Sequence, residues 1–163
     1  IEVSNSSCRY IGREFNMQIW DELLDAGKNY TALAVDDSHR PRDLFRNWTM
    51  ICAKSNSVAD LVKALKKGHF YSTQGPEFSK ISFDGKTFEA EFSPCTTAVL
   101  VGKRNSGVLG MVPDFEGPGT GHETTSLKCD LSHMPRDGYF RCQLIDADGK
   151  MAWSQPFRFD QEI

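Results

Sequence analysis

The residues best suited to chemistry form one short segment, Asp36-Asp37-Ser38-His39. It follows residues 30–35 (YTALAV), an unbroken apolar run typical of a strand buried on both faces of a parallel sheet. If the extended conformation continues, Asp37 and His39 point to the same side, because side chains alternate along a strand. A carboxylate oxygen and an imidazole nitrogen that converge are suitable ligands for zinc, iron or manganese. Asp36 points to the other side and is expected to orient a ligand. Taken alone, the same pattern also occurs in solvated loops and at helix caps.

The elements around this segment alternate between strands and helices. Strands are predicted at residues 1–5, 30–35 and 48–53 (WTMICA), and a helix at residues 16–26. A second helix begins after Ser57 as N-cap, with Asp60 in the capping-box position, and ends at Gly68. Its apolar stripe contains Val58, Leu61, Val62 and Leu65. This order predicts an α/β fold for residues 1–76.

The hydrophobic period changes from 3.6 to 2 after Pro76. Asp84-Gly85 and residues 146–149 (DADG) are tight-turn signals between alternating segments. Residues 103–123, rich in glycine and proline, are interpreted as one long loop. Short strands separated by turn signals predict an all-β sandwich for residues 77–163. The domain boundary is therefore placed near Pro76.

The first half resembles the C-terminal part of the polymerase and histidinol phosphatase (PHP) family of metal-dependent phosphoesterases. The resemblance covers about residues 1–80 and rests on IEVSN, WDELLDAG, YTALAVDDSH and ALKKGHFYSTQGPE in that order. In the family a "G-a-DDaH" segment supplies the last metal ligands, and an "AL-x-x-G-x-FY-s-x-GP" segment follows it. The end of the chain, MAWSQPFRF, weakly resembles the finish of members with a C-terminal β-domain.

The resemblance implies a fold, a reaction and a set of residues. The fold would be the C-terminal part of a β/α barrel, followed by the β-sandwich. Asp37 and His39 would be catalytic metal ligands, while Glu2 and Asn5 would support them or serve the structure. The cofactor would be zinc, manganese or iron. The reaction would be hydrolysis of a phosphate ester, in a phosphorylated small molecule or nucleotide, by metal-activated water.

The family's other ligands, including its N-terminal H-x-H or H-x-D motif, have no counterpart in this sequence. The remaining histidines are His69, His122 and His133, which are interpreted as structural or loop residues. Two ligands do not hold a metal cluster, so the chain alone is expected to be inactive. The strands at residues 30–35 and 48–53 are also expected to need further polypeptide beside them, from an N-terminal part, a second chain or a dimer partner.

An alternative reading makes the β-sandwich a non-catalytic binding module. The composition excludes only a few classes of function. The 163 residues include 25% charged side chains, with a net charge of −3. This balance gives no electrostatic signal for nucleic acid or an anionic membrane, and no apolar run approaches the ~18 residues of a membrane span. The five widely spaced cysteines are interpreted as reduced thiols, which favours a cytoplasmic location.

Overall fold

The computed structural model describes residues 1–104, 106–111 and 123–159. The chain divides into two compact units, Ile1–Gln74 (unit 1) and Gly75–Ile163 (unit 2). Within the described residues there are twelve β-strands and only two α-helices. The expected α/β class, with part of a β/α barrel in residues 1–76, is therefore wrong, because the chain is mainly β. No helix in the described part of the chain is long and apolar enough to cross a membrane.

Unit 1 begins with a pair of parallel strands, β1 (Glu2–Asn5) and β2 (Leu33–Val35), in which Asn5 lies beside Val35. The 3-10 helix η1 (Ser7–Ile11) and the helix α1 (Met17–Asp25) connect them. Trp20 and Leu24 of α1 are buried, and the Trp20 indole donates a hydrogen bond to the Tyr30 carbonyl at 2.8 Å. The two strands of this crossover therefore end at the same edge.

The rest of unit 1 is antiparallel. Strand β3 (Trp48–Ile51) follows the 3-10 helix η2 (Pro41–Asp43) and pairs with β4 (Phe70–Thr73). Residues 48–53 were expected to repeat the doubly buried strand of residues 30–35, but Met50 is 41% exposed. Apolar composition predicts a strand here but carries no information on its direction or on which face is covered. The Thr49 and Ser72 hydroxyls donate hydrogen bonds to the Ala34 and Ala32 carbonyls at 3.2 and 2.8 Å.

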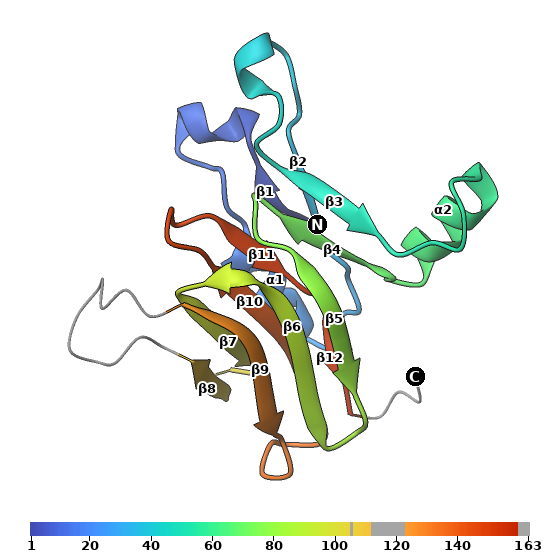
Figure 1. The fold of residues 1–163 in the computed structure, drawn as a ribbon, viewed down its shortest axis with the longest axis vertical. Helices are drawn as coiled ribbons and strands as arrows, with labels where there is room; N and C mark the ends of the chain where they lie inside the picture. Colours follow the sequence, from blue (N-terminus) through green and yellow to red (C-terminus); the bar gives the residue numbers. More distant parts are fainter. Residues whose placement is uncertain (105, 112–122, 160–163) are drawn as a thin grey trace. The chain divides into compact units, whose positions relative to one another are not determined.

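The helix α2 (Val58–Lys66) connects β3 to β4 (Figure 1). Its predicted N-cap is confirmed, because the Ser57 hydroxyl accepts a hydrogen bond from the Asp60 N–H at 3.2 Å. The predicted apolar stripe is covered only in part, since Val58 is 77% and Val62 is 42% exposed while Leu61 and Leu65 are half-buried. Ala64 is the one buried residue of this helix. The helical spacing of apolar residues therefore predicted the helix, but it did not predict which face of α2 is buried.

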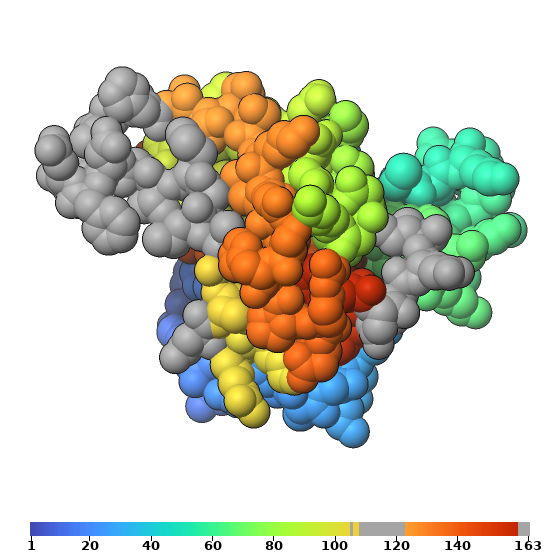
Figure 2. All heavy atoms as spheres, turned by 90° about the horizontal axis from the view of Figure 1, so that it is seen from below, coloured from blue at the N-terminus to red at the C-terminus, as the bar shows by residue number. Residues whose placement is uncertain are grey.

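Unit 2 contains two antiparallel sheets, shown as ribbons in Figure 1. One comprises β5 (Phe78–Phe83), β6 (Thr87–Cys95) and β9 (Thr124–Asp130). In Figure 2 these segments, coloured lime and orange, lie side by side at the surface. The other comprises β7 (Thr97–Gly102), β8 (Gly107–Met111), β10 (Tyr139–Ile145), β11 (Met151–Trp153) and β12 (Phe157–Arg158).

Phenylalanine rings form the core between these two sheets. Phe140 is fully buried, with its ring centroid 4.9 Å from that of Phe83, 5.6 Å from that of Phe88 and 5.3 Å from that of Phe157. Rings from both sheets thus meet in one cluster, as in a β-sandwich.

Both predicted turns of unit 2 are confirmed. Gly85 and Gly149 adopt left-handed φ values of 89° and 78°, which glycine allows without a steric penalty. The Asp84 and Asp146 carboxylates accept N–H groups of the residues that follow them. The expected loop at residues 103–123 contains a strand, β8, that the sequence interpretation missed. Residues 112–122 of that loop lie outside the described residues.

Candidate functional site

The candidate site forms at the edge of unit 1 where β1 and β2 both end. The parallel pairing continues for two residues past the strands, since the Ser6 and Ser7 N–H groups donate to the Val35 and Asp36 carbonyls at 3.0 and 3.1 Å. The carboxyl ends of parallel strands are where α/β proteins gather ligand-binding groups. This pairing therefore places Asn5 and Ser7 beside the segment that begins at Asp36.

Asp37 lies at the centre of the site. Its Oδ2 accepts a hydrogen bond from the Ser7 hydroxyl at 2.8 Å and one from Asn5 Nδ2 at 3.3 Å. Its other oxygen, Oδ1, lies 3.3 Å from His39 Nε2. The hydrogen bonds from Ser7 and Asn5, followed by the attraction of His39, lower the pKa of the Asp37 carboxyl. Asp37 is therefore a carboxylate held ionised at an exposed position.

The backbone of Asp37 is in the left-handed region, with a φ of 48°. This conformation is uncommon for a residue other than glycine and costs about 1–2 kcal/mol. It turns the chain immediately after β2, so Asp37 and His39 face each other without the extended conformation that the sequence analysis assumed. Strained residues of this kind cluster at functional sites.

Asn5 connects Glu2 to Asp37 through hydrogen bonds. It is 4% exposed, and its Nδ2 donates to Glu2 Oε2 at 2.9 Å as well as to Asp37. Its Oδ1 accepts from the Cys8 N–H at 3.2 Å and lies 3.2 Å from the Ser7 hydroxyl, whose one proton is donated to Asp37. Asn5 therefore fixes the positions of groups from β1, from η1 and from the segment after β2.

Asp36 has a different set of partners from the one expected. Instead of a neighbouring ligand, its carboxylate accepts three backbone N–H groups, from Phe45 at 2.6 Å, Arg46 at 3.0 Å and Asn47 at 2.8 Å. These bonds close the loop at residues 38–47. Asp36 thus holds the loop that contains His39.

Asp43 is a site-supporting residue that the sequence interpretation missed. It is 2% exposed, and its Oδ2 accepts the N–H groups of His39 at 3.2 Å and Arg40 at 3.0 Å. Its Oδ1 and the Asn47 Oδ1 are buried and have no hydrogen-bond partner among the described residues. The available signal was Pro41 followed two residues later by an acid, because an acidic residue at the third position of a helix accepts the backbone N–H of the N-cap residue.

His69, the other histidine of unit 1, does not join this site in the described structure. His69 and His133 are exposed and lie just before β4 and in the turn after β9. His122 lies outside the described residues. Within the described part of the chain, no group of three or more His, Cys, Asp or Glu side chains is placed to hold a metal ion. Asp37 and His39 are a pair of potential ligands rather than a full set.

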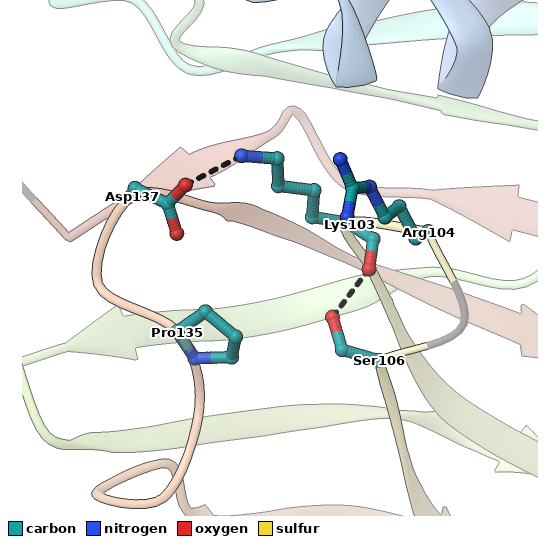
Figure 3. A pocket seen from close by; sticks show the side chains of 5 residues that line it. All are labelled: Lys103, Arg104, Ser106, Pro135 and Asp137. Carbon is teal, nitrogen blue, oxygen red and sulfur yellow. Dashed lines mark hydrogen bonds and ion pairs between the residues drawn. The ribbon is translucent and has the colours of Figure 1, made fainter.

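A separate pocket of about 420 Å³ lies in unit 2 (Figure 3). It is lined by Lys103, Arg104, Ser106, Pro135 and Asp137. Lys103 Nζ pairs with Asp137 at 2.6 Å, and the Ser106 hydroxyl donates to the Lys103 carbonyl at 2.6 Å. These polar groups already satisfy one another, and the ion pair accounts for the lowered pKa of Asp137. The pocket offers no nucleophile and base in contact, so Asp37 and its neighbours remain the stronger candidate.

Comparison of the chain with protein-family models, with curated proteins and with solved structures found no match.

Proposed function

We propose that this chain supplies part of the metal site of a phosphoesterase similar in chemistry to the PHP family. In this proposal Asp37 and His39 are metal ligands, and the substrate is a phosphorylated small molecule or nucleotide. The observation that carries the proposal is the convergence of the Asp37 carboxylate and the His39 imidazole beside the ends of two parallel strands. The left-handed backbone of Asp37 supports it, because the conformation costs free energy yet brings these two groups together.

The geometry of the two side chains is compatible with a shared metal ion. Ligand oxygen and nitrogen atoms lie about 2.1 Å from zinc, so two ligands at a tetrahedral angle are about 3.4 Å apart. Asp37 Oδ1 and His39 Nε2 are 3.3 Å apart. Little movement of either side chain would be needed to bind one ion.

The neighbouring residues favour the ionised ligand. Ser7 and Asn5 donate hydrogen bonds to Oδ2 of Asp37, which leaves Oδ1 directed at His39. The carboxylate is charged at neutral pH, and its lowered pKa extends to lower pH the range in which it is available to a cation. A bound divalent metal would lower the pKa of water and stabilise charge on phosphate oxygens.

Two metal ligands are too few for the chain alone to form a catalytic metal site. A catalytic zinc site uses three protein ligands, and two-metal sites need more. We therefore expect the remaining ligands to come from polypeptide outside the described part of this chain. On this proposal the 163-residue chain binds a single divalent ion weakly and does not hydrolyse p-nitrophenyl phosphate.

Zinc titration by isothermal calorimetry tests the proposal. The unmodified chain is expected to bind one Zn²⁺, and Asp37→Asn and His39→Ala are each expected to weaken binding at least tenfold. His133→Ala is the matched control, because it removes an exposed imidazole from unit 2. Equal zinc affinity in all four proteins, or loss only in the His133 variant, would refute the assignment. Rapid manganese-dependent hydrolysis by the chain alone would refute the ligand count.

A further inference from the structure

We infer that three arginines beside the candidate metal site form a binding site for a second phosphate group of the substrate. The residues are Arg9 of η1, Arg42 of η2 and Arg46 in the loop that follows. As a statement about the substrate, the inference rests on the proposed function. As a statement about anion binding, it rests on the arginines alone.

The side chains of Arg9 and Arg46 both contact the backbone of Arg42. The Arg42 carbonyl accepts hydrogen bonds from Arg9 Nη2 at 3.4 Å and from Arg46 Nε at 3.0 Å. The guanidinium carbons of Arg9 and Arg42 also lie 4.4 and 4.3 Å from the centre of the Tyr10 ring. Aromatic rings attract guanidinium groups, so the Tyr10 ring contacts both of these cations.

Among the described residues, no carboxylate forms an ion pair with Arg9, Arg42 or Arg46. The carboxylates of the adjoining loop, Asp36 and Asp43, accept backbone N–H groups instead. Like charges at short range repel, and a bound anion would remove that repulsion. Phosphate fits best, because planar guanidinium groups match its several oxygens with paired hydrogen bonds.

The cluster adjoins the candidate metal site but uses different residues. Ser7, which donates to Asp37, begins η1, and Arg9 follows two residues later, within about 7 Å of chain. On the other side, Arg42 follows His39 by three residues, within about 11 Å of chain. The Arg9 guanidinium is held by Ser6 Oγ at 2.9 Å rather than by Asp37. Because Arg9 is held by Ser6 and not by a proposed metal ligand, the arginines are assigned to a phosphate other than the one cleaved, in substrates that carry two phosphate groups.

The hydroxyl and ring of Tyr10 have a positioning role in this site. Its hydroxyl accepts a hydrogen bond from Arg9, and its ring is 50% exposed although it contacts two guanidinium groups. We expect Tyr10→Ala to loosen both arginines and to weaken phosphate binding without removing a charge.

Titration of the 163-residue chain with inorganic phosphate, followed by amide NMR in the presence of EDTA, tests the inference. The amides of η1 and η2 are expected to shift in a saturable way. Arg9→Gln and Arg42→Gln are each expected to weaken binding about tenfold, since each loses charge-assisted hydrogen bonds. Lys63→Gln in α2 removes the same charge from an exposed position and is expected to leave the affinity unchanged. Arg42 is also exposed, so its substitution leaves the core intact and the amide spectrum reports whether the fold is retained.

Two results would overturn the inference. One is the absence of saturable shifts in the unmodified chain, and the other is equal weakening by Arg42→Gln and Lys63→Gln. Because EDTA removes divalent metals, these results do not depend on the metal-ligand proposal. Conversely, if the chain binds phosphate but not zinc, the arginine site is supported and the metal-ligand proposal is refuted.

Discussion

Asn5 and Asp37 are 32 positions apart in the sequence, and Asn5 Nδ2 donates a hydrogen bond to Asp37 Oδ2 at 3.3 Å. The same amide nitrogen donates to Glu2, so one buried side chain holds two carboxylates in place. The pairing of β1 with β2 creates this contact, because it sets Asn5 beside Val35 at the end of the sheet. The geometry of the candidate site thus follows from the register of two short strands.

Substitution of Asn5 by alanine is expected to destabilise unit 1 and to release Asp37. The change removes hydrogen bonds to Glu2 and Asp37 and leaves the Cys8 N–H without its acceptor. The expected loss of unfolding free energy is about 1–3 kcal/mol, with a rise in the pKa of Asp37. Urea denaturation and NMR titration of the Asp37 carboxyl carbon measure the two effects. Asn29→Ala, at an exposed position, is the control; equal effects of both variants would contradict the role of Asn5.

The stabilising effect of Asp37 is expected to depend on pH. Its pKa is lowered by Ser7, Asn5 and His39, so the folded state binds this proton less tightly than the unfolded chain. The contribution is therefore complete above the unfolded pKa of about 3.9 and is lost as pH falls through the lower folded value. The stability difference between the unmodified chain and Asp37→Asn should shrink as pH falls below that range. Asparagine tolerates the left-handed backbone, so the comparison isolates the charge. A difference that stays constant with pH would contradict this account.

Removal of the Asp36 carboxylate is expected to free the loop at residues 38–47. Asp36→Ala leaves the N–H groups of Phe45, Arg46 and Asn47 without their acceptor. Amide hydrogen exchange at these positions should accelerate, with a loss of about 1–3 kcal/mol in unfolding free energy. Asp36→Asn keeps one acceptor oxygen and should have an intermediate effect. Unchanged exchange in the alanine variant would show that Asp36 does not hold the loop.

Truncation of Phe140 is expected to be the more damaging of two phenylalanine substitutions. Phe140 is fully buried among four other rings, so Phe140→Ala should cost about 3–5 kcal/mol in unit 2. Phe45→Ala removes the same atoms from a side chain that is 88% exposed and should change stability by less than about 0.5 kcal/mol. Urea denaturation of both variants makes the comparison. Similar losses would show that the phenylalanine cluster is not the core of unit 2.

The sequence predicts local features, such as caps and turns, that depend on residues close together in the chain. The cap formed by Ser57 and Asp60 and the turn at Asp84-Gly85 depend on residues only a few positions apart, and both are present as predicted. Strand direction depends on distant partners, so the antiparallel pairing of residues 48–51 with β4 was not predictable from its apolar run.

The same distinction applies to the candidate site. The residue types in Asp37 and His39 indicated chemistry, but the left-handed turn that brings them together is a property of the fold. Asp43 was missed because its importance arises from burial, which its sequence neighbours do not reveal. The strand β8 was missed because glycines interrupt its short apolar run.

Paramagnetic broadening by Mn²⁺ tests the metal assignment most directly. Substoichiometric Mn²⁺ added to the labelled chain should broaden the amide signals of Asp37, Ser38 and His39 before all others, followed by that of Ser7. The Asp37→Asn variant should lose this selectivity at the same manganese concentration. Broadening that begins elsewhere, or that is spread evenly over exposed carboxylates such as Asp148, would contradict the claim that Asp37 and His39 bind a metal.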